Sequence, residues 1–363
     1  MKQKHTLRLF SIIAVIASIG FTFIACDGSG SPAGNNQQTG NDQQTGNDTS
    51  NNNNETAWDD VNRGRIAYSI DGIYWRRAPI NSILRAVTRV AYGNGRFVAV
   101  SGDTFLTGNH PMIVYSTDGI NWTAIEYAVF GTEGVSDIAF GNGRFVAVGG
   151  NRHISGGRGR IAHSVDGISW TELAAENTTF GISSIFDIAW GSDRFIAVGE
   201  VGRGASSPDG ITWTPISGTG TENIVFGNGT WVSGVSWFPI RHSTTNGQSW
   251  TGAYLVVGGG AILDMAFGND RFVAVGQTGR IGSSPNGANW TLATNTPFFD
   301  NPISSVAFGN GRFIAAGANN IMARSTDGIS WTAIPNNGGL GNTFFIHAIT
   351  YGNGKFVSVG WGR

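Results

Sequence analysis

"AFGNGRFVAVG", residues Ala139 to Gly149, is one of seven closely similar stretches in the chain. Asn-Gly near its centre is the strongest short signal for a β-hairpin, because a type I′ turn needs positive φ at both central residues. Apolar residues alternate on either side, at Ile138 and Phe140 before the turn and at Phe145 and Ala147 after it, which predicts two strands. The copies begin at Tyr92, Phe140, Trp190, Phe226, Phe267, Phe308 and Tyr351.

A second motif with its own glycine turn alternates with the first. One copy reads "YSTDGINW", from Tyr115 to Trp122. The seven copies end at Trp75, Trp122, Trp170, Trp213, Trp250, Trp290 and Trp331, which are 47, 48, 43, 37, 40 and 41 residues apart. Two hairpins within such a period make one four-stranded unit, which is typical of a propeller blade. We expect the tryptophans to pack between blades rather than to hold a ligand.

The two ends of the repeat region are complementary. It opens at Gly64 with the second motif alone and closes, near residue 363, with the first motif alone. Six complete blades and two halves make seven, and pairing of the halves would hide two exposed sheet edges. We therefore predict an all-β, seven-bladed β-propeller of four-stranded antiparallel blades over residues 61–363. The N-terminal and C-terminal half-blades are expected to close its ring.

The second motif resembles the Asp-box, S-x-D-x-G-x-T-W, of BNR-repeat propellers, a superfamily with sialidase-like and sortilin-like members. "STTNGQSW", from Ser243 to Trp250, has the full eight-residue length, with Thr245 in place of the aspartate. Other copies, such as "STDGINW" from Ser116 to Trp122, are one residue shorter. The resemblance covers residues 64–363 and implies the propeller fold, but it does not imply one activity.

The N-terminal 60 residues indicate export and attachment to a membrane. Residues 1–25 combine a basic start with an apolar run and are interpreted as a lipoprotein-type signal peptide. "FIAC", from Phe23 to Cys26, resembles a lipobox, and Cys26 is the only cysteine of the chain. Residues 26–60 would then be a lipidated cysteine and a flexible, low-complexity tether. We expect a lipid-anchored, extracytoplasmic protein of the bacterial cell envelope; the alternative is an uncleaved membrane anchor.

Composition limits the partners. The chain has 363 residues, of which 13% are charged and 55 are glycine, and its formal net charge is -1. This mild acidity gives no electrostatic footprint for nucleic acid or for anionic lipid. The expected partner is a protein or a glycan, with membrane contact through the lipid anchor only. We expect a monomer without a cofactor, apart from a structural cation that the channel could hold.

Propeller geometry predicts where a ligand would bind. In a four-stranded antiparallel blade the tight turns of both motifs share one face of the disc, and the variable loops share the opposite face. We call these the corner face and the variable-loop face. The candidate ligand-binding residues are Arg152, His153, Arg158, Trp237, Phe238, Arg241, Phe298, Phe299, Phe344 and Phe345, with Phe105, His110, His242 and His347 in the same loops. Exposed aromatic residues mixed with arginine suit an interface or a sugar platform; the alternative is that half of the aromatics pack beneath their loops.

A second candidate site is the first position of each innermost strand. The seven residues there are Arg89, Asp137, Asp187, Asn223, Asp264, Ser305 and Ala348. Arg89, Asp137, Asp187 and Asp264 would lie at the channel mouth, where the three aspartates could bind a cation or position a water molecule. Alternatively, each aspartate accepts backbone hydrogen bonds from the neighbouring loop. The corner arginines are interpreted as solvated turn residues: Arg96, Arg144, Arg194, Arg271 and Arg312.

Three functions are compatible with these features. The first is a binding or scaffolding module that recognises a glycan or protein with the variable-loop face. The second is a sialidase-like glycan hydrolase, which needs three arginines, a tyrosine nucleophile with a glutamate partner, and an acid/base carboxylate. Only Arg89 among the inner-strand positions fits that pattern, so we predict no catalytic residues. The third is an envelope assembly factor that holds another protein.

Overall fold

The computed structural model describes residues 63–79, 87–101, 113–125, 130, 133–150, 158–234, 240–253, 260–335, 339–340 and 344–362. The signal peptide, Cys26 and the tether proposed from the sequence lie outside these residues. The described ranges contain no helix with the length and apolar character that crossing a membrane requires.

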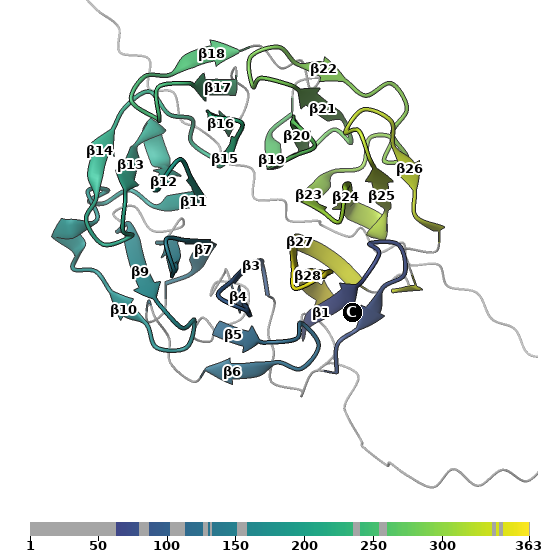
Figure 1. Cartoon of the computed structure of the whole chain (residues 1–363), viewed down its shortest axis with the longest axis horizontal. Coiled ribbons are helices and arrows are strands. Elements are labelled where there is room, and N and C mark those ends of the chain that lie inside the picture. The colour runs from purple at the N-terminus through teal and green to yellow at the C-terminus, as the bar shows by residue number, and fades with distance from the viewer. Residues whose placement is uncertain are drawn as a thin grey trace, which may run out of the picture. The chain divides into compact units, whose positions relative to one another are not determined.

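Seven four-stranded antiparallel sheets are arranged as blades in a ring around a central channel (Figure 1). Blade 1 comprises β3 (Arg89–Gly93), β4 (Arg96–Val100), β5 (Ile113–Ser116) and β6 (Thr123–Ile125). Blade 2 comprises β7 (Val135–Gly141), β8 (Arg144–Gly149), β9 (Arg160–Ser164) and β10 (Thr171–Glu172). Blade 3 comprises β11 (Ile185–Gly191), β12 (Arg194–Gly199), β13 (Gly204–Ser207) and β14 (Thr214–Ile216). Blade 4 comprises β15 (Asn223–Gly227), β16 (Thr230–Gly234), β17 (Ile240–Ser243) and β18 (Thr251–Ala253). Blade 5 comprises β19 (Ile262–Gly268), β20 (Arg271–Gly276), β21 (Ile281–Ser284) and β22 (Thr291–Leu292). Blade 6 comprises β23 (Ile303–Gly309), β24 (Arg312–Gly317), β25 (Met322–Ser325) and β26 (Thr332–Ala333). The first strand named in each blade is innermost.

Blade 7 closes the ring, as the sequence predicted. Its strands are β27 (Phe344–Gly352), β28 (Lys355–Gly362), β1 (Arg63–Ser69) and β2 (Arg76–Arg77), in that order outward from the channel. β1 pairs with β28 over seven residues, with Ile66 opposite Val359. Ring closure therefore joins the first and last strands of the described chain.

Each first-motif corner is a hairpin turn with positive φ at both central residues. Asn142 and Gly143 have φ of 46° and 70°, which confirms the type I′ prediction. The glycine before the turn serves a different purpose, because a Cβ atom on Gly141 would lie 2.2 Å from Cγ of Trp190 in the next blade. The same contact recurs around the ring: Gly93 with Phe140, Gly141 with Trp190, Gly191 with Phe226, Gly227 with Phe267, Gly268 with Phe308, Gly309 with Tyr351, and Gly352 with Tyr92.

The second-motif turns are held by their own serine and aspartate. In blade 2 the Ser164 hydroxyl donates to Asp166 at 2.9 Å and accepts the Gly167 N–H at 2.8 Å. Asp166 also accepts the N–H groups of Ile168 and Ser169, both at 2.8 Å. Partial burial raises the pKa of Asp166, but these hydrogen bonds outweigh it and lower the pKa to about 2.

Acid is therefore expected to weaken these turns. A folded-state pKa below the unfolded value gives stability that is present above pH 4 and is lost as the pH falls toward 2. In blade 5 Asn286 holds the aspartate position and still accepts two backbone N–H groups, so Asp166→Asn should keep the fold. Melting temperatures measured from pH 4 to pH 2 should fall less for Asp166→Asn than for the wild type; equal slopes would contradict this account.

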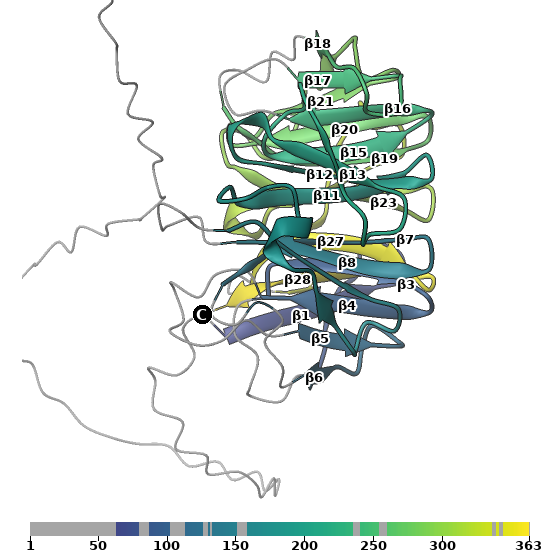
Figure 2. The same ribbon diagram turned by 90° about the vertical axis from the view of Figure 1, so that its left-hand side faces the viewer.

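The second-motif tryptophans pack as predicted, within and between blades. Trp75 is 4% exposed and lies in an apolar cluster with Ile314 of blade 6 and Phe356 of blade 7. Trp213 and Trp331 are similarly buried. Figure 2 shows the disc from its edge, with the turns that join β3 to β4 and β7 to β8 on its right-hand side. Short 3-10 turns also lie between strands, among them η1 (Ala175–Asn177), η2 (Glu200–Gly202) and η3 (Ala318–Asn320).

Candidate functional site

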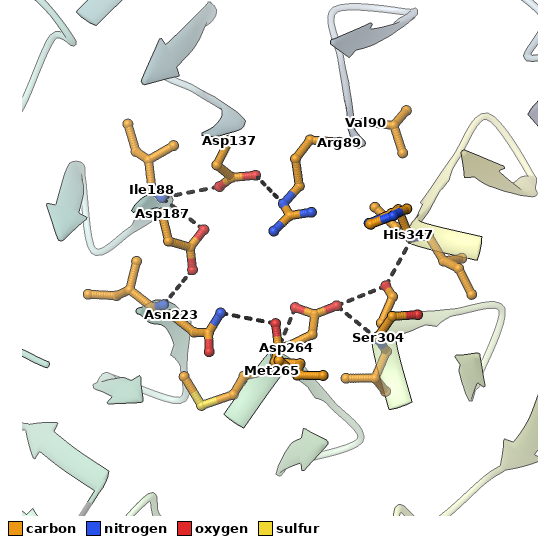
Figure 3. Close-up of a pocket in the computed structure, with 16 residues that line it drawn as sticks. Arg89, Val90, Asp137, Asp187, Ile188, Asn223, Asp264, Met265, Ser304 and His347 are labelled. Atoms are coloured by element: carbon orange, nitrogen blue, oxygen red, sulfur yellow. Dashed lines mark hydrogen bonds and ion pairs between the residues drawn. The ribbon is translucent and has the colours of Figure 1, made fainter. Parts of the chain in front are cut away.

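The innermost strands bring a ring of polar side chains to one end of the channel. We call the seven residues at this level the ring residues: Arg89, Asp137, Asp187, Asn223, Asp264, Ser305 and Ala348. In five blades a β-bulge immediately precedes the ring residue, for example between Val135 and Asp137 of β7. A bulge turns a side chain away from the regular alternation, and three bulge residues, Leu263, Ser304 and His347, also line the channel cavity. This cavity has a volume of about 200 Å³ and is lined by all seven ring residues (Figure 3).

The ring residues link each blade to the next. Asp137 accepts the N–H of Ile188 at 3.1 Å, and Asp187 accepts that of Ile224 at 2.6 Å. Asp264 accepts the N–H of Val306 at 2.9 Å. These bonds support the alternative that the aspartates accept hydrogen bonds from backbone N–H groups. The donors lie on the innermost strand of the following blade, however, and not in a neighbouring loop.

Neutral members of the ring continue the same linkage. The amide of Asn223 donates to the Leu263 carbonyl at 3.1 Å. The Ser305 hydroxyl donates to Asp264 at 2.8 Å and accepts the N–H of Ile349 at 3.0 Å. Ala348 has no polar side-chain atom with which to continue the chain. The linkage therefore runs from blade 2 to blade 7 and stops before blade 1.

The position inside the channel changes the protonation of the aspartates. Burial raises the pKa of Asp187 well above its usual range, and the neighbouring Asp137 raises it further. Burial also raises the pKa of Asp264 to about 6, against the opposing hydrogen bonds from Val306 and Ser305. Both carboxyls are enclosed by protein, although part of their surface still reaches water. Arg89 compensates some of the charge through an ion pair of 3.6 Å with Asp137.

An aromatic group adjoins the ring in blade 7. Phe345 stacks on Trp361 with ring centroids 4.4 Å apart. The Trp361 indole N–H donates to Nε2 of His347 at 2.8 Å, and burial lowers the pKa of His347 to about 4. Sequence reasoning predicted a role for His347 and Phe345 but missed Trp361, which pairs with β1 across the ring closure. Among the described residues no group of three His, Cys, Asp or Glu side chains could hold a metal ion.

The described candidate residues of the variable-loop face are not all exposed. Phe298 and Phe344 are 0% and 1% exposed, so these two follow the alternative that part of the aromatic residues pack beneath their loops. Phe298 packs in the blade 5–blade 6 core and takes the place that Phe130 and Phe180 hold elsewhere, each five residues before an inner-strand aliphatic residue. Phe344 packs beside Ile346 in the core next to the ring closure.

The remaining candidates divide into exposed, partly buried and undescribed residues. Phe299 is 78% exposed, Arg158 is exposed and Phe345 is partly buried. Arg241 is exposed but lies in β17, with His242, rather than in a loop. The candidates Phe105, His110, Arg152, His153, Trp237 and Phe238 lie outside the described residues.

Two further apolar residues are exposed on the variable-loop face. Ile182, in the connection between β10 and β11, is 67% exposed, and Val201, in η2, is 90% exposed. Val201 has a φ of 59° and Phe299 a φ of 51°, a backbone conformation that is unfavourable for residues other than glycine. Strained residues with exposed apolar side chains are common at functional sites. Their exposure depends on loop geometry, which the repeat pattern does not predict.

Two of the corner arginines, Arg96 and Arg144, contact protein groups, which corrects for these two the prediction of solvated turn residues. Arg96 donates to the carbonyl of Asp166 in the next blade, and its guanidinium lies 5.2 Å from the ring centre of Tyr115. Arg144 Nη1 lies 2.8 Å from Nδ1 of His163. In blade 7 Lys355 donates to the carbonyl of Asp118 at 2.7 Å. Arg96 and Lys355 thus connect their corners to the second-motif turn of the following blade.

Fold and channel together define a seven-bladed β-propeller whose blades are linked through the channel ring. No protein-family model matches the chain, and no curated protein matches it. Among solved structures, YCF48 bound to D1 peptide is similar, with a TM-score of 0.58 and 15% identity over 76% of this chain and 89% of the other. YCF48 from Cyanidioschyzon merolae has a TM-score of 0.55 and 15% identity over 76% and 94% of the two chains. At this identity the likeness shows the fold alone.

Proposed function

We propose that this chain is a lipid-anchored BNR-type propeller of the cell envelope that binds a protein partner with its variable-loop face. Three exposed apolar residues, Ile182, Val201 and Phe299, carry the proposal. Each of these residues lies in a connection opposite the corner face. Two of them sit on unfavourable backbone, which a protein retains when the surrounding structure or a partner requires it.

Two further observations support a binding function. YCF48, which shares the fold, has been solved with a bound peptide. The channel aspartates that a hydrolase would use are occupied by hydrogen bonds between blades. Cys26 and the tether of residues 26–60 would hold the propeller away from the lipid surface.

The full chain, probed on peptide and glycan arrays, tests the proposal. Phe299→Ser should weaken peptide binding by about tenfold or more, since exposed aromatic anchors dominate interface energies. Tyr74→Ser is the matched control, because Tyr74 is 77% exposed but lies in a second-motif turn on the corner face. Equal losses in the two variants would contradict a variable-loop interface. Glycan spots that lose sugar, with the loss abolished by Arg89→Ala, would favour the hydrolase instead.

A further inference from the structure

One second-motif turn departs from the other six and changes the contact between blades 3 and 4. The turn from Ser243 to Trp250 is one residue longer, and Thr245 replaces the aspartate. The Thr245 hydroxyl accepts the N–H of Ser249 at 2.9 Å, so it takes over one acceptor role of the aspartate without its charge. The blade 3 corner therefore faces a neutral turn of different shape.

No atom of Arg194, the corner arginine of blade 3, is among the three atoms nearest to the turn glycine of blade 4. In three other blades the cation lies against the turn glycine of the next blade: the Cδ atoms of Arg144, Arg271 and Lys355 lie 3.4, 3.1 and 3.3 Å from a Cβ built on Gly210, Gly328 and Gly119. The nearest atoms to a Cβ on Gly247 belong instead to Ile196 and Ile216. Arg194 therefore does not make the close contact with the turn glycine that these three cations make.

The guanidinium of Arg194 lacks a protein partner. Within the described part of the chain its Nε atom is buried without a hydrogen bond, and Arg194 forms no ion pair. Arg96 and Arg312 share an unpaired Nε, although Arg96 still donates to the next blade. A buried donor without a partner costs about 1–3 kcal/mol.

Beside Arg194 lies a cavity of about 410 Å³, within the usual range for small-molecule sites. Its polar lining comprises Arg194, Ser206, Thr214, Ser217, Asn246 and Gln248. Arg194 is the single charged residue among the lining residues, and the five others are hydroxyl and amide side chains that both donate and accept hydrogen bonds. The cavity thus combines one positively charged guanidinium group with neutral side chains that can form hydrogen bonds.

We infer that this cavity binds an acidic monosaccharide unit, with the sugar carboxylate on Arg194. A planar guanidinium matches a carboxylate with two parallel hydrogen bonds. Hydroxyl and amide side chains match sugar hydroxyls, which also both donate and accept. A peptide fits less well, because an extended peptide would add to the outermost strand β14, where Pro215 removes an N–H donor. The site lies between corner-face turns and does not rest on the proposed function.

Titration of the full chain with sodium glucuronate, followed by saturation-transfer NMR, tests the inference. We expect saturable binding at about millimolar concentration, with glucose, acetate and a glutamate tripeptide each at least about tenfold weaker. Arg194→Gln should abolish glucuronate binding. Arg194→Lys should weaken it, because an ammonium group cannot form the two parallel hydrogen bonds that a guanidinium group forms with a carboxylate. Arg271→Gln, in the equivalent corner of blade 5, should leave it unchanged.

Several outcomes would overturn the inference. These are glucuronate binding that survives in Arg194→Gln, equal loss in Arg271→Gln, equal affinity for acetate, preference for the glutamate tripeptide, or no saturation by glucuronate. Unfolding of the variants should not account for a loss of binding, because the Arg194 side chain makes no hydrogen bond or ion pair within the described residues. Melting temperatures of the Arg194 variants should not fall below that of the wild type.

Discussion

Replacing Gly309 by alanine is expected to lower the free energy of unfolding by about 3 kcal/mol or more. Gly309 precedes the corner of blade 6, and its backbone lies outside the left-handed region. A Cβ atom there would lie 2.1 Å from Cγ of Tyr351 in blade 7. Since the ring of blades cannot widen at one junction alone, Tyr351 would have to leave its packed position beside Phe356.

Gly311→Ala is the matched control, two residues away in the same corner. Gly311 has a φ of 70°, but nothing lies within 4 Å of its Cβ position. Its substitution should cost only the left-handed backbone penalty of about 1–2 kcal/mol. Urea unfolding of both variants measures the difference. If Gly311→Ala cost as much as Gly309→Ala, backbone conformation rather than contact between blades would explain the glycine pattern.

Substitution of Asp264 by asparagine should remove part of the pH dependence of stability. Burial raises the pKa of Asp264 to about 6, so its contribution is fully present below the unfolded pKa near 4 and is lost as the pH rises through 6. For a carboxyl that still reaches some water, this loss amounts to about 2–3 kcal/mol. Asparagine is already present at the equivalent position of blade 4, where Asn223 donates to Leu263.

Urea midpoints at pH 4.5, 5.5, 6.5 and 7.5 would show the effect. The wild type should lose stability over this range, and Asp264→Asn should lose less. Asp166→Asn is the control: the second-motif aspartates have lowered pKa values, so they titrate at more acidic pH. A wild-type profile that rises toward pH 7.5 would contradict a raised pKa at Asp264.

The seven blades could be predicted from the sequence because the signals are local and repeated. Positive φ at Asn142 and Gly143 depends on two adjacent residues, and the seven copies confirm one another. The closing blade could be predicted because the repeat region begins with the second motif alone and ends with the first motif alone. The order of β27, β28, β1 and β2 confirms it.

The candidate site was less predictable because burial in loops depends on neighbouring blades. Phe298 and Phe299 are adjacent and chemically identical, yet they are 0% and 78% exposed. Alignment of Phe298 with Phe130 and Phe180, relative to the inner strand, would have indicated the buried member. The cavity beside Arg194 depends on the turn of a different blade, so no local pattern around Arg194 contains it.

The pairing of β1 with β28 also determines the order of events in folding. β1 is synthesised before every blade between it and β28, but its partner consists of residues 355–362. Pairing across such a long stretch of chain is slow, because loop closure must precede the contacts that stabilise it. Until then β1 presents an unpaired edge, which is a hazard for aggregation. A chain released before Lys355 would therefore keep that edge open however well its first six blades had formed.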